Sequence, residues 1–280
     1  MASPAVVLTI AGSDSSGGAG IQADIKTISA LGGYAASAIT ALTAQNTTGV
    51  RAIHAPEPAF HAQQIDAVFE DLSVSAVKIG MLHSRAVAHV VAQAVAQHRP
   101  AHLVLDPVMV ATSGAVLIDP DTVETLVAEL FPLASLITPN LDEAAHLLGR
   151  PVTRLEDMPA AAAALIDMGA RAVLLKGGHL TNAQGAPSGQ VSDLLVLAGG
   201  QQHVFEQPRV ATTNTHGTGC SLSAAIATLL ALGHGLPQAV EAAQAYVHAG
   251  LTAAMGLTIG KGHGPINHFF QPAAMRILPT

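Results

Sequence analysis

Short apolar runs alternate with amphipathic stretches along most of this chain, and that alternation restricts the possible folds more than any other feature. Six short, mainly apolar runs predict buried strands: Val6–Ile10, Ala35–Leu42, Ala76–Ile79, His102–Leu105, Ser135–Ile137 and Ala172–Leu175. Helical patterns lie between and after them: Ala19–Leu31, Pro58–Asp71, Arg85–Gln97, Pro120–Phe131, Asn140–Leu148, Leu155–Asp167, Ser221–Leu232 and Pro237–Met255. Repeated strand–helix units of this kind predict a mostly parallel sheet with helices on both faces.

The segment from Leu180 to Pro208 interrupts this rhythm. Within it, Val191–Leu197 and His203–Phe205 predict a hairpin or a pair of edge strands. Neither a linker-like stretch nor an internal repeat divides the chain. We therefore expect one α/β domain over residues 1–280.

Composition argues against several classes of protein. The formal net charge is −7 and no run of Lys or Arg is present, which argues against a nucleic-acid surface. The single Cys rules out an intrachain disulfide and suits a reducing cytosol. No apolar run is long enough to span a bilayer, and no basic segment precedes the first strand as it would in a signal peptide. We expect a cytoplasmic protein that binds neither nucleic acid nor membrane.

Polar residues and glycines stand at the carboxyl ends of the predicted strands. The groups that follow successive strands are Gly12-Ser13-Asp14, Gln45-Asn46-Thr47, Gly80-Met81, Asp106-Pro107, Thr138-Pro139-Asn140 and Lys176-Gly177-Gly178-His179. In open parallel sheets, ligands bind in the crevice at this end of the strands. We therefore expect these groups to line one shared crevice.

The segment Asn214–Ser221 contains two glycines and the only cysteine, Cys220, directly before a helical pattern. A Gly- and Thr-rich loop that opens a helix presents unpaired backbone N–H groups beside the positive end of the helix dipole. Residues Gly217–Cys220 therefore predict an anion site suited to phosphate. The structural alternative is a tight turn with a buried Cys.

Three charged side chains stand where they need partners. Asp24 falls within the apolar stripe of the helix Ala19–Leu31, so its carboxylate requires either a ligand or hydrogen bonds from loop N–H groups. Lys176 ends a strand and is expected to lie along a polyphosphate. Asp106 ends another strand within reach of the same crevice.

Asn140 and Glu143 have the spacing of a capping box at the start of a helix. The functional alternative is that their oxygen atoms hold Mg²⁺ through water, because Mg²⁺ prefers a few protein oxygens together with phosphate. Both interpretations stay open from the sequence.

A dinucleotide-binding pattern near the N-terminus is not convincing. Gly18–Ala23 satisfies it after a strand, but the acidic residue expected about 20 positions later is missing, and Leu42–Asn46 stands there instead. Ser13–Gly17 also makes the spacing from the strand too long. We do not expect a nicotinamide cofactor.

Eight stretches, spread over essentially the whole length, follow one family pattern. They are Thr9–Asp24, Thr40–Thr47, Lys78–Leu82, Leu105–Met109, Ile137–Ala144, Leu175–His179, Asn214–Ser221 and Gly260–Pro265. In these stretches the chain resembles the hydroxymethylpyrimidine/phosphomethylpyrimidine kinases of thiamine biosynthesis, which belong to the ribokinase-like superfamily. The resemblance implies a three-layer α/β/α domain that uses ATP and Mg²⁺. It also implies phosphorylation of 4-amino-5-hydroxymethyl-2-methylpyrimidine to the monophosphate and then to the diphosphate, and often a homodimer.

The resemblance also implies roles for individual residues. Gln45 reads the edge of the pyrimidine, and the pocket is lined by Gly12, Asp24, Met81 and Val108. The catalytic set is Cys220, Asp106, Gly217 and Gly219; contacts to ATP come from Lys176, Asn140, Thr215 and Thr218, and those to Mg²⁺ from Glu143, Asn140 and Asp106. Because a thiol at a helix N-terminus has a lowered pKa, Cys220 is expected to accept the proton of the hydroxymethyl group.

Two other activities compete with this interpretation. Vitamin B6 kinases share the fold, so pyridoxal or pyridoxine phosphorylation is an alternative main or side activity; Gln45 favours the aminopyrimidine. A cysteine-dependent hydrolase with His216 as the base for Cys220 is a different class. The sequence offers no third orienting group or nucleophile elbow for that pair.

Overall fold

The centre of the molecule is a nine-stranded sheet, seen in a computed structural model that describes residues 3–109, 118–178, 180 and 189–278. The strands lie in the order β10-β9-β8-β7-β6-β5-β2-β3-β4. Their bounds are Val6–Asp14 (β2), Tyr34–Asn46 (β3), Gly49–His54 (β4), Val74–Ile79 (β5), Leu103–Leu105 (β6), Leu136–Ile137 (β7), Ala172–Leu175 (β8), Gln190–Leu197 (β9) and Gln202–Pro208 (β10). From β8 to β3 all neighbours are parallel, whereas β4, β9 and β10 are antiparallel to the strands they join.

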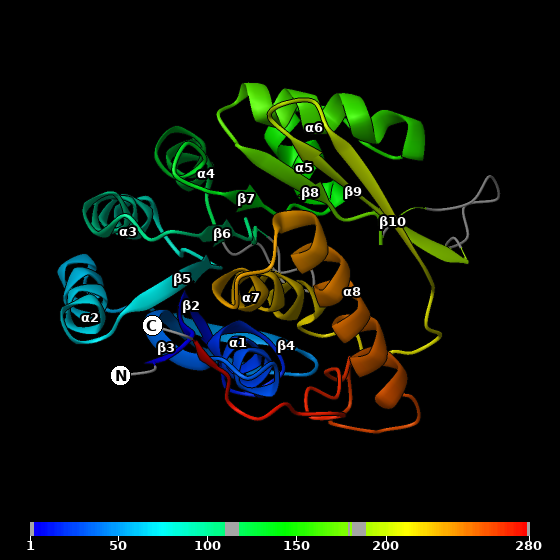
Figure 1. Ribbon diagram of the computed structural model, residues 1–280, viewed down its shortest axis with the longest axis horizontal. Coiled ribbons are helices and arrows are strands. Elements are labelled where there is room, and N and C mark those ends of the chain that lie inside the picture. The colour runs from blue at the N-terminus through cyan, green and yellow to red at the C-terminus, as the bar shows by residue number, and fades with distance from the viewer. Residues whose placement is uncertain (1–2, 110–117, 179, 181–188, 279–280) are drawn as a thin grey trace.

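Helices cover both faces of this sheet (Figure 1). Their bounds are Gly20–Ala30 (α1), Pro58–Asp71 (α2), Arg85–His98 (α3), Pro120–Thr125 (α4), Leu141–Leu148 (α5), Met158–Asp167 (α6), Thr218–Ala231 (α7) and Leu236–Ala253 (α8). Helices α1, α7 and α8 pack on one face and α2 to α6 on the other. The predicted three-layer α/β/α arrangement is confirmed. None of the described helices has both the length and the apolar character needed to cross a bilayer.

The apolar strands are explained by this burial on two sides. Leu8 and Ile10 of β2 belong to the core beneath α2 to α6, whereas Val7, which directly precedes Leu8, belongs to the core beneath α1, α7 and α8. Because successive side chains of a strand point to opposite faces, a strand covered on both sides is apolar at most of its positions. This is the physical basis of the runs from which the sheet is predicted.

The structure departs from the predicted elements at the β4 edge of the sheet. Strand β3 continues to Asn46, so Gln45 lies in the end of a strand and not in a loop. The sequence analysis missed β4, whose residues are all partly or fully exposed and include Arg51 and His54. An edge strand of this kind has no apolar run to reveal it. The predicted helix Pro120–Phe131 also contains a π-helical turn over Leu126–Leu130.

The carboxyl ends of the parallel strands lie side by side, as predicted. Backbone hydrogen bonds continue the ladder just beyond the strands: Gly80 N to Ile10 O at 2.9 Å, Asp106 N to Ile79 O at 2.9 Å, Thr138 N to Leu105 O at 3.0 Å and Lys176 N to Pro139 O at 3.0 Å. The residues that follow different strands are thereby fixed relative to one another.

A buried ion pair joins helix α1 to the middle of the sheet. Lys78 of β5 donates to both carboxylate oxygens of Asp24, at 2.8 and 3.0 Å, and Thr9 of β2 donates to the same carboxylate at 2.6 Å. All three residues are fully buried. Burial opposes a charge on Lys78, but the Asp24 carboxylate more than compensates and raises the pKa of the ammonium. The partner that Asp24 needs is therefore a lysine, neither a ligand nor the loop N–H groups.

Removing one partner of this pair should cost far more than removing both. Lys78→Met leaves a buried carboxylate without its cation, so we expect a loss of about 3–5 kcal/mol in the free energy of unfolding. The double variant Asp24→Leu/Lys78→Met should recover most of that loss, because no buried charge remains. Urea unfolding followed by circular dichroism measures both.

The control is a surface pair. Arg154 and Glu156 are 73% and 72% exposed, so Arg154→Ala should change the free energy of unfolding by less than about 1 kcal/mol. A double variant no more stable than Lys78→Met would contradict the assignment of the cost to an unpaired charge.

Candidate active site

A cavity of about 850 Å³ lies at the carboxyl ends of the parallel strands, where helix α7 begins. Nearly all the residues expected from the sequence line it: Gly12, Gln45, Met81, Asp106, Val108, Asn140, Glu143, Lys176, Thr215, Gly217, Thr218, Gly219 and Cys220. Asp24 does not line it, which corrects the expectation for that residue. Its carboxylate is held by Lys78, and Lys78 contributes to the cavity wall in its place.

The Gly-rich segment Gly217–Cys220, where α7 begins, lines this cavity. Gly217 has φ 78° at the start of α7, and a side chain there would collide with the carbonyl oxygen of Gly18. The Thr218 hydroxyl donates to the carbonyl of Thr215 at 3.1 Å. No side chain caps this helix within the described part of the chain. The first turn of α7 is therefore open to an anion, in agreement with the predicted phosphate site.

Lys176 sits between two carboxylates beside this loop. Its ammonium donates to Asp106 at 2.9 Å and lies 3.8 Å from Glu143. The start of α7 lies beside the lysine, since a Cβ atom on Gly219 would lie 3.4 Å from the Lys176 ammonium, an ordinary van der Waals distance. Burial alone would raise the pKa of Asp106, but Lys176 and then Lys78 hold it below its usual value. The Asp106–Lys176 pair is therefore charged.

Asn140 and Glu143 form the capping box at the start of α5. The Asn140 side chain accepts from the Glu143 N–H at 2.8 Å, and the Glu143 carboxylate accepts from the Asn140 N–H at 2.7 Å. The capping interpretation is confirmed. Burial raises the pKa of Glu143 to about 7, with Lys176 opposing the rise and Asp106 adding to it.

The donor set also fits a magnesium ion that is completed by a phosphate ligand. No group of three His, Cys, Asp or Glu side chains among the described residues could hold a metal alone. Mg²⁺ keeps several waters and commonly takes one or two carboxylates together with substrate phosphates. Asp106 and Glu143 supply that number of carboxylates to the cavity wall.

Cys220 lies in the first turn of α7 and lines the cavity. The expectation that its pKa is lowered is wrong. Burial raises the pKa of the thiol to about 11; Lys78 works against the rise, whereas Asp24 and Asp106 add to it. The partial charge at a helix N-terminus does not compensate for loss of solvent together with two nearby carboxylates.

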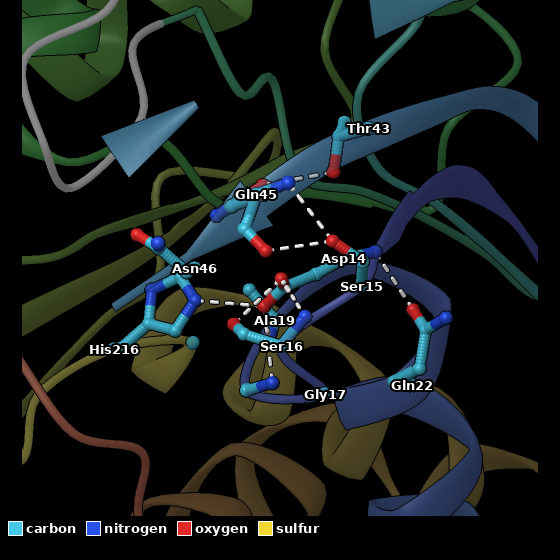
Figure 2. Close-up of polar contacts among 12 residues, drawn as sticks. Asp14, Ser15, Ser16, Gly17, Ala19, Gln22, Thr43, Gln45, Asn46 and His216 are labelled. Carbon is cyan, nitrogen blue, oxygen red and sulfur yellow. Dashed lines mark hydrogen bonds and ion pairs between the residues drawn. The ribbon is translucent and has the colours of Figure 1, made fainter. Parts of the chain in front are cut away.

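The sequence analysis missed the role of Lys78, and although it named Asp14 and His216, it did not pair them. Asp14 is only 2% exposed, and its carboxylate pairs with the His216 ring nitrogen Nε2 at 2.8 Å (Figure 2). A lysine inside an apolar strand is a usable signal for Lys78, but no spacing rule connects Asp14 to His216. The His216 ring nitrogen Nε2 is bonded to Asp14, which argues against its service as the base for Cys220 in a hydrolase.

Comparisons with known proteins agree with this geometry. Residues 14–267 match a family model described as phosphomethylpyrimidine kinase. The chain is 50% identical to the hydroxymethylpyrimidine/phosphomethylpyrimidine kinase of Salmonella typhimurium, covering 94% of this chain and 96% of that one. It is 49% identical to the thiamine biosynthesis bifunctional protein of Geobacter sulfurreducens, covering 96% of this chain but only 53% of that longer relative. The crystal structure of an ADP complex of Bacillus subtilis pyridoxal kinase is similar, with 31% identity, a TM-score of 0.84 and coverage of 95% and 98%.

The raised thiol pKa predicts slow alkylation at neutral pH. Because Cys220 is the only cysteine, iodoacetamide consumption by the intact chain reports on this thiol alone. The thiolate is the reactive form, so the rate should keep rising with pH toward a midpoint near the pKa of about 11. A midpoint at or below about 8.5, the value of an ordinary thiol, would contradict the dominance of burial.

Proposed function

This chain belongs to the phosphomethylpyrimidine kinase family, and from that premise we propose that it phosphorylates 4-amino-5-hydroxymethyl-2-methylpyrimidine with ATP. The monophosphate formed first is the acceptor for a second phosphoryl group, which gives the diphosphate used in thiamine biosynthesis. The observation that carries this proposal is the open start of α7, which lies against Lys176 and Asp106 in one cavity. That arrangement suits transfer of a phosphoryl group.

The cavity divides into two subsites. On the side of β2 and β3, we assign the pyrimidine to Gln45, Gly12, Met81 and Val108. A side chain on Gly12 would collide with the Met81 methyl group, so glycine is what lets the thioether close over this part of the pocket. On the α7 side we assign the phosphates to Lys176, Asn140, Thr215 and Thr218.

Charge neutralisation and alignment then supply most of the rate. Backbone N–H groups at Gly217 and Gly219 are fixed donors for the developing charge on the transferred group, and the Lys176 ammonium adds a full positive charge beside them. Mg²⁺, when bound with ATP, supplies further charge neutralisation; we assign it to Asp106 and Glu143, with Asn140 holding Glu143 in place through the capping box.

We propose Cys220 as the proton acceptor for the hydroxymethyl group. With a pKa of about 11 the thiol is mostly protonated at neutral pH. Only its small thiolate fraction can accept the proton, so Cys220 contributes less than a fully ionised base would. Little base assistance is needed when the transition state is loose. Positioning of the alcohol therefore matters more than the strength of the base.

The family premise extends to the assembly and location of the protein. We propose one ribokinase-like domain over residues 1–280, in the cytoplasm, as a homodimer. Strand β4 is an edge of the sheet, and such an edge is a surface that a second copy can cover. Light scattering after size-exclusion chromatography tests the dimer.

Pyridoxal phosphorylation is the second candidate activity, favoured by the likeness of this fold to the Bacillus subtilis pyridoxal kinase. The proposed phosphate subsite does not contact the acceptor ring. Selection between the pyrimidine and pyridoxal therefore depends on contacts to the ring edge, such as those of Gln45. The deciding experiment separates the mono- and diphosphate products over time from ATP, Mg²⁺ and the hydroxymethylpyrimidine, with pyridoxal in a parallel reaction. A higher kcat/KM for pyridoxal would reverse our choice, and no phosphorylated pyrimidine would reject the main proposal.

Gln45→Ala should weaken binding of the pyrimidine and leave ATP unaffected. The Gln45 side-chain oxygen lies 3.2 Å from the Thr43 hydroxyl, and the side chain carries no charge that a phosphate could use. Loss of one good edge hydrogen bond costs roughly 1–3 kcal/mol, which is read as a rise in KM for the alcohol. Gln97→Ala on the exposed face of α3 is the control. A rise in KM for ATP alone would show that the two subsites are assigned the wrong way round.

Cys220→Ala should impair the first phosphorylation more than the second. The first acceptor is a neutral alcohol, whereas the second is a phosphate monoester, already largely ionised at neutral pH because its second pKa is about 6. We expect a loss of about 100-fold in the first step, the low end for a general base, and a small loss in the second. Separate assays on the alcohol and on the monophosphate measure this, and equal losses would assign Cys220 to phosphate positioning.

A further inference from the structure

The loop of residues 15–19, between β2 and α1, is held by the carboxylate of Asp14. One carboxylate oxygen accepts from the Ser16 N–H at 2.8 Å and from the Ser16 hydroxyl at 2.7 Å. The other accepts from the N–H groups of Gly18 at 3.0 Å and Ala19 at 2.9 Å, and from His216 at 2.8 Å (Figure 2). Five donors therefore converge on one carboxylate that is almost completely buried.

His216 links the 15–19 loop to the start of α7, since it directly precedes Gly217 in the chain. Its ring lies on Gly18, where a side chain would collide with the ring carbon Cδ2, and its backbone N–H donates to Gly264 at 3.0 Å. The backbone of Gly217 in turn rests on the carbonyl oxygen of Gly18. The start of α7 is thus seated on the 15–19 loop through direct contact.

The same loop also reaches the pyrimidine side of the cavity. The Ser15 hydroxyl donates to the Gln45 carbonyl at 2.6 Å and accepts from the Gln45 N–H at 2.8 Å. Thr43, two residues earlier in β3, donates to the carbonyl of Ser13 at 2.7 Å. The start of α7 and the Gln45 backbone therefore both contact one short loop.

We propose that Asp14 and His216 are positioning residues for phosphoryl transfer and that Ser15 is a positioning residue for the pyrimidine, so that the 15–19 loop sets the spacing between donor and acceptor. This inference rests on the proposed kinase function. Displacement of a reacting group by about 1 Å costs on the order of 100-fold in rate, so an aligned pair of subsites needs a fixed spacer. Although burial alone would raise it, the hydrogen bonds from His216 and Ser16 hold the pKa of Asp14 well below its usual value, which keeps the carboxylate charged.

The phosphate arm of the test uses His216. His216→Leu removes the donor to Asp14 and should lower kcat about 100-fold in both phosphorylation steps, with KM for the pyrimidine unchanged. His216→Gln keeps a side-chain N–H that can donate to Asp14, so it should recover most of the lost kcat. His234→Leu, at an exposed histidine after α7, is the matched control.

The pyrimidine arm uses Ser15. Ser15→Ala frees the Gln45 backbone and should raise KM for both pyrimidine substrates, while KM for ATP stays unchanged. Ser29→Ala, at an exposed serine of α1, is its control. Thermal unfolding by circular dichroism is recorded for every variant. A merely structural role would lower Tm without the selective change in kcat for His216 variants or in the pyrimidine KM for Ser15→Ala.

The inference is overturned if folded His216→Leu keeps wild-type kcat, or if His216→Gln recovers nothing. Should His216→Leu fail to fold, Ser15→Ala decides, and equal rises in KM for ATP and for the pyrimidine overturn the proposal. Failure of the kinase assignment itself is distinguishable, because the wild-type chain would then make no phosphorylated pyrimidine.

Discussion

Five buried or nearly buried charged groups lie together at the floor of the cavity, and their charges have to balance. The ammonium groups of Lys78 and Lys176 meet three carboxylates, those of Asp24, Asp106 and Glu143, in a region with little or no solvent. A buried charge without a partner is costly. The set contains one more carboxylate than ammonium groups. Burial raises the pKa of Glu143 to about 7, and the nearby Asp106 carboxylate adds to the rise while Lys176 opposes it. When all three carboxylates are ionised, the site favours one further cation, which agrees with a metal ion arriving with a nucleotide.

The register of the parallel sheet places these charged side chains on the correct face. Ala76 of β5 belongs to the core beneath α1 and α7, whereas Val77 and Ile79 belong to the opposite core. Lys78 therefore shares its face with Ala76 and meets Asp24 on α1. A slip of one residue would send the ammonium into the apolar core beneath α2 to α6 and leave Asp24 unpaired. The ion pair thus opposes the wrong register as well as supporting the site.

The fold and most of the residues that line the site can be predicted from the sequence, but the contacts between those residues cannot. Apolar runs mark every parallel strand because both faces are buried, and they fail at β4 because its side chains are exposed. The strand-end rule finds Asp106 and Lys176 without coordinates. It cannot show that Asp14 meets His216, 202 positions away, or that Asp24 meets Lys78, 54 positions away. The predicted lowering of the Cys220 pKa is wrong for a related reason. Burial raises that pKa, and burial depends on the folded structure.

A site that transfers two phosphoryl groups in succession has to tolerate two different acceptors. In the proposed reaction, backbone N–H groups at the start of α7 serve both acceptors, because an amide donor needs no particular protonation state. In the proposed mechanism a thiol base serves only the alcohol, so a high pKa at Cys220 limits the first phosphorylation and not the second. These backbone N–H donors are therefore the part of the site that both phosphorylation steps share. We assign recognition of the acceptor ring to a different place, the end of β3, and under that assignment one phosphate subsite can be common to kinases that act on different acceptors.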